Sequence, residues 1–456
     1  MNKLQENTIC SVSTGHGEGA IALIRVSGNK SLSICKKIFF SKKIITTKQI
    51  KPNLAYYGKI KDFDQIIDEV ILTYFKAPKS YTGEDMVEIS CHGSEYIQKK
   101  IIELLINKGC FLAKRGEFTL RAFLNGKLDL SQAESVANLI SAKNSKSHEL
   151  AMKQMRGGYS ENIQLLRKKL IKFGALIELE LDFSTEDVEF ADRKDLINLL
   201  SEMITKIEPL IKSFKYGNAI KNGIPITIVG PPNSGKSTLL NKILNEERAI
   251  VSDIKGTTRD VIEETFNIEG FEYRFIDTAG LRKTNNEIEK IGIQKTHEKI
   301  NEAAVIIYLF DINDFNKTQI IDNLNFIKTK DLEVVLVGNK TDLNKSEIKE
   351  FEGEIIYCSL LNNKGTDQIL NSILHKTKKW KNLNHEFVIT NQRHYEAFTN
   401  TLESIRLIKA GIQSKISGEL LSIDIKSALN SLGEITGEIT NEDLLDSIFK
   451  DFCIGK

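Results

Sequence analysis

The sequence predicts an α+β multidomain protein with a mixed α/β N-terminal domain, an all-α helical domain and an α/β domain inserted into the helical one. Short strand patterns fill the first part, and long patterns of apolar residues at 3.6 spacing follow them. Strands then alternate with helices, and the helical pattern resumes to the end. The expected domains cover residues 1–118, 119–216, 217–378 and 379–456, the second and fourth being two halves of the helical domain.

Composition describes an ordinary globular chain, with 456 residues, 41% of them hydrophobic and 27% charged. The formal charge of +2 indicates no global affinity for nucleic acid, so an RNA contact needs a local basic surface or a partner. The longest apolar run, residues 303–310, has strand length, so we expect neither a signal peptide nor a membrane span. Six cysteines without a C-x-x-C pair indicate reduced thiols and a cytoplasmic protein.

The elements of each domain follow from local patterns. In the first domain we expect strands at residues 8–12, 20–26, 55–60, 69–75 and 86–91, and a helix at 95–108. In the helical domain we expect helices at 132–145, 160–181, 193–214, 391–412, 419–432 and 441–452. In the inserted domain we expect strands of a parallel, doubly wound sheet at 224–229, 263–268, 273–276, 305–310, 334–337 and 355–357.

Residues 230–237 read Gly-Pro-Pro-Asn-Ser-Gly-Lys-Ser between a predicted strand and a predicted helix, the context that a phosphate-binding P-loop needs. In such a loop, backbone N–H groups and the helix N-terminus bind phosphate. Lys236 would reach the β- and γ-phosphates, and the Ser237 hydroxyl would bind Mg²⁺. A chance match is the alternative, and the flanking elements argue against it.

Three further segments complete the predicted nucleotide site, and the last of them predicts GTP rather than ATP. Asp277 begins an Asp-Thr-Ala-Gly sequence after a strand, where its carboxylate can hold Mg²⁺ through water. Thr258 lies in a switch-like loop and could complete the Mg²⁺ shell when triphosphate is bound. Asp342 ends an Asn-Lys-Thr-Asp sequence, and its carboxylate can accept both the N1–H and the 2-amino group of guanine, which adenine does not offer.

Residues 359–361 read Ser-Leu-Leu where GTPases usually carry Ser-Ala-Lys, so a lysine stem over the base is missing and we expect weaker base packing. The residues expected to bind nucleotide and Mg²⁺ are Asn233, Ser234, Gly235, Lys236, Ser237, Thr238, Thr258, Asp277, Thr278, Ala279, Gly280, Asn339, Lys340, Asp342 and Ser359. Leu281 stands where Ras-like GTPases carry a water-positioning glutamine. Either hydrolysis is slow or another group orients the water, with Glu287 and Glu289 as the candidates. Another cation would then meet the transition-state charge.

Two charged, glycine-containing stretches lie in the first part of the chain, at residues 81–93 and 116–130. Read alone, they are interpreted as solvated charges and turns, and His92 as a hydrogen-bonded structural histidine. The last four residues, Cys-Ile-Gly-Lys, allow three interpretations. A prenylation box is disfavoured because Gly455 is not aliphatic. A frayed tail and a cysteine delivered to an active site both stay open.

Together these motifs resemble the MnmE (TrmE) family of tRNA-modification GTPases. The resemblance rests on residues 81–85, 115–118, 121–130, 256–260, 277–282 and 453–456. It implies an N-terminal domain that binds a tetrahydrofolate derivative (5,10-methylene- or 5-formyl-tetrahydrofolate) and dimerises, and an inserted Ras-like GTPase domain. It also implies a homodimer that joins the FAD-binding partner MnmG in a heterotetramer. That complex adds a carboxymethylaminomethyl or aminomethyl group to C5 of the wobble uridine, position 34, of tRNA.

The resemblance also implies roles for single residues. Glu289 would orient the attacking water, and Cys453 would lie near the folate. The expected folate contacts are Arg25, Glu88, Lys127 and Lys456. The expected K⁺ ligands are Asn233, Ser252, Ile254 and Thr257. This K⁺ would supply the missing positive charge when two GTPase domains meet.

One departure and one alternative qualify the resemblance. Residues 13–17 read Ser-Thr-Gly-His-Gly where relatives usually read Pro-Pro-Gly-Arg-Gly, so no contact of this loop is carried over. The alternative function is a ribosome-assembly or regulatory GTPase switch, since related GTPase domains share the P-loop and Leu281. The folate-like first half and Cys453 discriminate between the two, because a switch needs neither. Glycine or ammonium as the nitrogen source, and the tRNAs modified, stay open.

Overall fold

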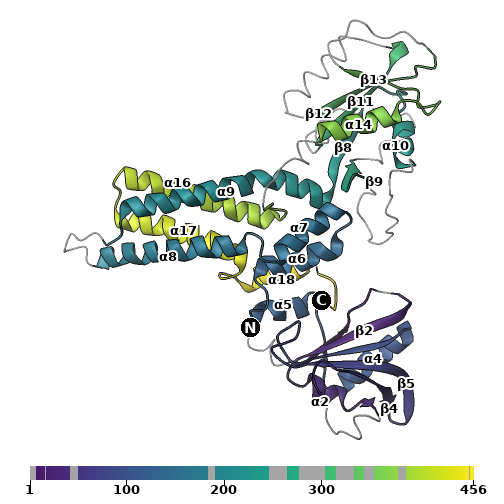
Figure 1. Ribbon diagram of the computed structural model, residues 1–456, viewed down its shortest axis with the longest axis vertical. Coiled ribbons are helices and arrows are strands. Elements are labelled where there is room, and N and C mark those ends of the chain that lie inside the picture. Colours follow the sequence, from purple (N-terminus) through teal and green to yellow (C-terminus); the bar gives the residue numbers. More distant parts are fainter. Residues whose placement is uncertain are drawn as a thin grey trace. The chain divides into compact units, whose positions relative to one another are not determined.

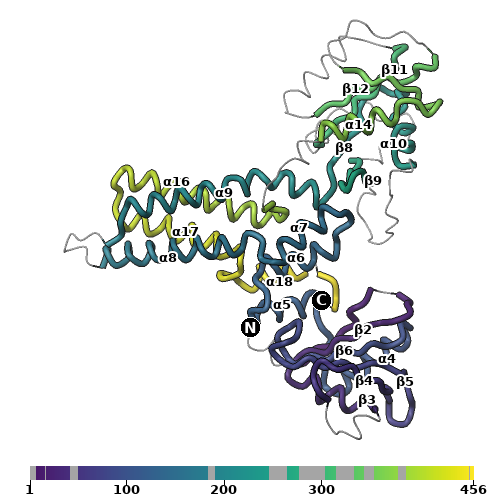
Figure 2. The backbone as a smooth tube through the Cα atoms, viewed as in Figure 1, coloured from purple at the N-terminus to yellow at the C-terminus, as the bar shows by residue number. Residues whose placement is uncertain are grey.

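The computed structural model describes residues 7–15, 17–41, 50–182, 190–245, 264–276, 303–314, 333–343, 354–377, 387–450 and 452–455. The chain forms two compact units. One comprises Met1–Ser141, Ala151–Ile204 and Ala397–Lys456, and the other comprises Ala142–Leu150 and Thr205–Glu396. Figure 1 labels most of the elements of both units, and Figure 2 traces the same backbone as a tube.

The first unit begins with a seven-stranded sheet of order β3-β4-β5-β6-β2-β1-β7. Its strands are β1 (Ile9–Val12), β2 (Gly19–Ser27), β3 (Phe39–Phe40), β4 (Ala55–Asp62), β5 (Gln65–Phe75), β6 (Met86–Gly93) and β7 (Phe111–Leu112). Neighbours pair antiparallel, except that β1 and β7 are parallel. Helices α2 (Ser31–Cys35) and α4 (Glu95–Asn107) cover one face, where alternate strand residues form the core. The predicted strands and helix of this domain are confirmed.

The rest of the first unit is helical. Its complete helices are α5 (Glu117–Leu124), α6 (Leu130–Ser141), α8 (Ser160–Asp182), α17 (Gly418–Thr436) and α18 (Glu442–Lys450). Helices α8 and α17 lie side by side (Figure 1), where Arg167 Nε donates to the Leu429 carbonyl over 3.2 Å. Three more helices contribute residues to both units: α7 (Ser145–Met155), α9 (Arg193–Asn222) and α16 (Gln392–Gln413).

The helix predicted at residues 132–145 is confirmed as α6, but its predicted end is four residues too late, and α7 was not predicted. Helix α6 ends at Ser141 and α7 begins at Ser145. Asn144 caps α7, since its side-chain Oδ1 accepts the Ser147 N–H over 2.8 Å. Residues 143–149 are all polar, so the sequence shows no apolar period there that would indicate the start of α7. Helix α5 was not predicted, because its eight residues are too few to show a period.

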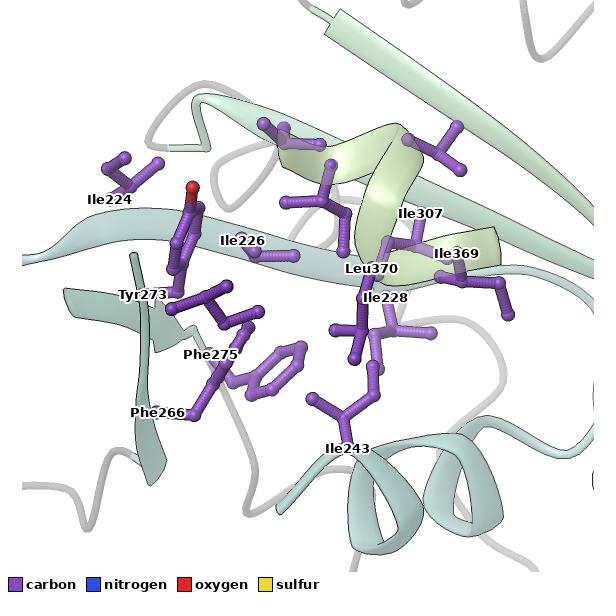
Figure 3. Packing of buried hydrophobic residues seen from close by; sticks show 14 of the residues in the cluster. Ile224, Ile226, Ile228, Ile243, Phe266, Tyr273, Phe275, Ile307, Ile369 and Leu370 are labelled. Carbon is purple, nitrogen blue, oxygen red and sulfur yellow. The ribbon is translucent and has the colours of Figure 1, made fainter. Parts of the chain in front are cut away.

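The second unit contains a six-stranded sheet of order β13-β12-β11-β8-β10-β9. The strands are β8 (Ile224–Val229), β9 (Glu264–Ile268), β10 (Phe271–Phe275), β11 (Val305–Asp311), β12 (Glu333–Asn339) and β13 (Ile355–Tyr357). All neighbours are parallel except β9 and β10. Helices α10 (Lys236–Leu244) and α14 (Thr366–Lys376) add their apolar faces to one core, shown in Figure 3.

The chain places β8 at the centre of this sheet, continues to β9 and β10 on one side and then to β11 on the other. This reversal makes the carboxyl end of β8 a topological switch point, where open α/β sheets bind ligands. The arrangement is that of a Ras-like P-loop domain, and it confirms the predicted α+β multidomain fold class. None of the helices that the structure describes is long and apolar enough to cross a membrane.

Candidate functional site

The loop at the carboxyl end of β8 is built around two glycines with positive φ. Gly230 has φ 148°, and a Cβ there would lie 1.9 Å from the Leu309 carbonyl oxygen. Gly235 has φ 101°, and a Cβ there would lie 2.5 Å from Asn339 Nδ2. Only glycine permits these close approaches, so the sequence fixes a narrow backbone turn that leads into α10. A helix N-terminus at this place favours an anion.

Lys236, the first residue of α10, folds back over this loop. Its Nζ donates to the carbonyls of Gly230 (3.0 Å) and Pro231 (2.7 Å). Burial lowers the pKa of the Lys236 ammonium, because it loses hydration without gaining a carboxylate. The buried Ser234 Oγ has no hydrogen-bond partner among the described residues. The loop thus offers a cation and an unsatisfied hydroxyl, a donor set that fits a phosphate group.

The second part of this site lies at the ends of β12 and β13. The side chain of Asn339, 4% exposed, joins the two loops: its Nδ2 donates to the Ser234 carbonyl (2.8 Å) and its Oδ1 accepts the Leu360 N–H (3.1 Å). Ser359 Oγ donates to Asp342 Oδ1 over 2.6 Å, which fixes the orientation of the carboxylate. The structure therefore brings together the residues predicted to bind phosphate and guanine.

Lys340 and Leu361 lie in the loops that follow β12 and β13. Lys340 has φ 69°, and its Nζ lies 2.7 Å from Asp311 Oδ2. Burial acts to raise the pKa of Asp311, but hydrogen bonds from Lys340 and Asn313 outweigh it, and the net pKa is lowered. Leu361, at the place of the missing lysine, is 81% exposed. The apolar side chain of Leu361 is thus solvent-exposed two residues after Ser359, the hydrogen-bond partner of Asp342, where it could contact a base.

Several predicted site residues lie outside the described residues and stay predictions: Ser252, Ile254, Thr257, Thr258, Asp277, Thr278, Ala279, Gly280, Glu289 and Lys456. Of the remaining P-loop positions, Asn233 has φ 59° and is exposed, Ser237 lies in the first turn of α10, and Thr238 is exposed on the same helix. Within the described ranges, no cluster of three His, Cys, Asp or Glu side chains is arranged to hold a metal ion.

A second cluster of functional side chains lies on the first unit's sheet, on the face away from α4. Arg25 of β2 pairs across the strands with Glu88 of β6, and Arg25 Nε lies 2.8 Å from Glu88 Oε1. The guanidinium also lies 5.1 Å from the centroid of the Tyr81 ring. Tyr81 donates to or accepts from Thr119 Oγ1 over 2.8 Å. Both charges are partly exposed, so this ion pair can exchange partners with a ligand.

Arg121 corrects the interpretation of the neighbouring stretch as solvated charge. Its side chain is 1% exposed and lies 3.1 Å from Glu84 and 2.9 Å from Glu117. The Arg121 guanidinium also donates to the Asn7 carbonyl over 2.8 Å. Sequence reasoning missed this network, and the i,i+4 spacing of Glu117 and Arg121 was the signal that could have indicated it. The network holds the 81–85 loop beside the Arg25–Glu88 pair.

Lys127 and His92 both have defined partners. Lys127 Nζ donates to the Pro78 carbonyl over 3.2 Å. Lys127 Cγ would lie 3.2 Å from a Cβ at Gly83, so its stem packs against the same 81–85 loop. His92 Nδ1 lies 2.7 Å from Asp68 Oδ1, which agrees with a hydrogen-bonded structural histidine.

The C-terminal residues dock on the same domain. Ile454 forms a β-bridge with Arg115, and the Gly116 N–H donates to the Cys453 carbonyl over 3.3 Å. Ser13 Oγ donates to the Gly455 carbonyl over 2.9 Å. The tail is thus ordered against the end of β1, whose Ser11 pairs with Arg25. Cys453 is exposed, whereas the other five cysteines are buried. Of the two open interpretations, the docked tail disfavours fraying.

Comparisons with known proteins cover the whole chain. The family model described as "MnmE helical domain" matches residues 130–453, and the one described as "GTP-binding protein TrmE N-terminus" matches residues 8–127. The tRNA modification GTPase MnmE of Flavobacterium psychrophilum is 48% identical over 461 residues, covering 99% of this chain and 100% of that protein.

The protein of the same name from Cytophaga hutchinsonii is 47% identical, over 99% of this chain and 98% of its own length. The one from Bacteroides thetaiotaomicron is 45% identical, over 99% of this chain and 100% of its own length. These relatives match from end to end. The match to the helical-domain model includes the P-loop domain described above, and the match to the N-terminal model precedes it. The chain therefore belongs to the MnmE family of tRNA modification GTPases.

Proposed function

We propose that this chain is the GTP-hydrolysing component of the complex that modifies C5 of the tRNA wobble uridine, position 34, in the cytoplasm. The observation that carries the proposal is the end-to-end match to tRNA modification GTPases, together with a P-loop whose glycines permit contact with phosphate. The product would be a carboxymethylaminomethyl or aminomethyl uridine. The protein would act as a homodimer, in a complex with the FAD-dependent partner MnmG. These finer statements come from the family resemblance.

At the nucleotide site, the chain's own residues bind and orient GTP. Lys236 exchanges its two carbonyl partners for phosphate oxygens, which compensate its charge more strongly. Asp342, oriented by Ser359, accepts the guanine N1–H and 2-amino group. Glu289 orients a water that attacks the γ-phosphate, which yields GDP and phosphate. Leu281 cannot do this, because its side chain has no polar atom.

The metal ions act through charge. Ser237, Thr258 and Asp277 would hold Mg²⁺, and Asn233, Ser252, Ile254 and Thr257 would hold K⁺ once two GTPase domains pair. Bound there, the ions neutralise charge that develops on the phosphates. Hydroxyl, carboxylate, amide and carbonyl oxygens are the ligands that such hard cations prefer. Of these residues the structure describes only Asn233 and Ser237. The agreement between the residue types and the two ions is therefore structural only for the P-loop ligands.

In the first unit, Arg25, Glu88, Lys127 and Lys456 would bind a tetrahydrofolate derivative, which supplies the one-carbon unit. Arg25 and Lys127 suit a ligand carboxylate, and Glu88 suits a pterin amino group. The partly exposed Arg25–Glu88 pair and the aromatic ring of Tyr81 fit a flat, hydrogen-bonding ligand. Cys453 would lie near this ligand: its thiol is exposed, and its carbonyl accepts the Gly116 N–H of the same unit.

The test is mass spectrometry of tRNA nucleosides from cells depleted of this protein and complemented with wild type, Lys236→Ala or Cys453→Ser. Restoration of the 5-substituted wobble uridine by wild type alone would support the proposal and assign roles to both sites. An unchanged nucleoside profile after depletion would contradict it and favour a ribosome-assembly or regulatory GTPase switch. Folate binding by the full chain discriminates further, because a switch does not need it.

A further inference from the structure

Cys358, the residue that follows β13, makes three hydrogen bonds to one short segment of the chain. Its N–H donates to the Gly338 carbonyl over 2.9 Å, and its carbonyl accepts the Thr341 N–H over 3.2 Å. Its thiol lies 3.6 Å from Asn339 Oδ1 and donates to it. The buried Cys358 is therefore hydrogen-bonded to the backbone on both sides of Asn339 and to the Asn339 side chain itself.

The thiol helps to decide which way the Asn339 amide points. With the observed orientation, Oδ1 accepts from both Cys358 Sγ and the Leu360 N–H, and Nδ2 donates to the Ser234 carbonyl. A rotated amide would set its NH₂ group against two donors and its oxygen against a carbonyl. Burial raises the pKa of the Cys358 thiol to about 12, so it remains an S–H donor near neutral pH.

Cys358 also has little freedom to move. A Cβ at Gly365, which has φ 92°, would lie 2.7 Å from Cys358 Cβ, so α14 begins in direct contact with this side chain. The next residue, Ser359, donates to Asp342 Oδ1 over 2.6 Å. Cys358 therefore positions the Asn339 side chain, and the next residue, Ser359, positions the Asp342 side chain.

We propose that Cys358 is a positioning residue for guanine recognition: by holding Asn339 and the turn around it, it aligns Asp342 with the base edge. The inference rests on the proposed function, since it requires that this site binds guanine nucleotides. It assigns to Cys358 no contact with the nucleotide. Its effect on the discrimination of the base is therefore indirect, through Asn339 and the turn that carries Asp342.

The experiment measures the Kd values of GDP and inosine diphosphate for the full-length protein with Mg²⁺ by titration calorimetry. Inosine lacks the 2-amino group, so the ratio of the two Kd values reports how well Asp342 is aligned. Cys358→Ala removes the donor and Cys358→Ser keeps one. Cys91→Ala is the matched control, because Cys91 is equally buried and its thiol donates to the Ala22 carbonyl (3.5 Å) in the other unit.

We expect Cys358→Ala to weaken GDP binding about 3- to 10-fold, as for one lost hydrogen bond, and to weaken inosine diphosphate binding less. Cys358→Ser should restore the ratio, and Cys91→Ala should leave it at the wild-type value. The ratio does not depend on the folded fraction, so a loss of folded protein alone would not change it. An unchanged ratio in Cys358→Ala overturns the inference while the proposed function stands. Wild-type protein that binds neither nucleotide overturns both.

Discussion

Replacing Gly455 by alanine should release the C-terminal tail from the N-terminal domain. At the Arg115–Ile454 bridge and beside it, two hydrogen bonds join the described part of the tail to the N-terminal domain, from Ser13 Oγ to the Gly455 carbonyl and from the Gly116 N–H to the Cys453 carbonyl. At about 1 kcal/mol each they supply about 2 kcal/mol, which favours the docked state roughly 30-fold. Gly455 has φ 93°, which costs alanine about 1–2 kcal/mol. The new Cβ would also lie 2.1 Å from the Val12 carbonyl oxygen, so docking becomes unfavourable.

Hydrogen exchange detected by mass spectrometry follows this release, because the Gly116 amide loses its acceptor. Exchange in peptides that span residues 114–118 should accelerate by roughly the docking ratio, about 10- to 100-fold. Folate affinity should fall, and GTP hydrolysis should stay at the wild-type rate. Gly109→Ala is the matched control, since its φ is 106° but no atom lies within 4 Å of the new Cβ. Unchanged exchange at Gly116 in Gly455→Ala would refute the reasoning.

Four further outcomes are expected. Leu361→Lys should tighten GDP binding several-fold by placing an alkyl stem over the base, and calorimetry showing equal or weaker affinity would remove that explanation of the Ser-Leu-Leu loop. GTP should be hydrolysed faster in K⁺ than in Na⁺ at equal ionic strength, so equal phosphate-release rates would exclude a catalytic K⁺. Glu289→Ala should bind GTP normally yet lose hydrolysis, and retained turnover would move the role to Glu287 or to solvent. Iodoacetamide should add one label to the native protein, at Cys453, because the other five thiols are buried, and a second label in the intact mass would contradict the structure.

The sequence predicted those features that depend on local pattern. The P-loop needed only a strand, a glycine loop and a helix in succession, and residues 224–229 form β8 as expected. Asn339 is the last residue of β12 and Asp342 follows the strand, so their place at the sheet's edge also followed from the strand pattern. Arg121 could not be interpreted in this way, because its burial depends on Glu84, which is 37 residues away. The contact of Ser13 with Gly455 joins residues 442 positions apart.

The two sites belong to different compact units, and this limits how they can communicate within one chain. Every described nucleotide-site residue lies in the second unit, whereas Arg25, Glu88, Lys127 and Cys453 lie in the first. The chain passes from one unit to the other between Ser141 and Ala142 and within α7, α9 and α16, each of which contributes residues to both units. Pro209 lies inside α9, where it removes a backbone N–H and so makes that helix easier to bend. Helices α7 and α16 contain no proline, so their backbone hydrogen bonds are not interrupted in this way.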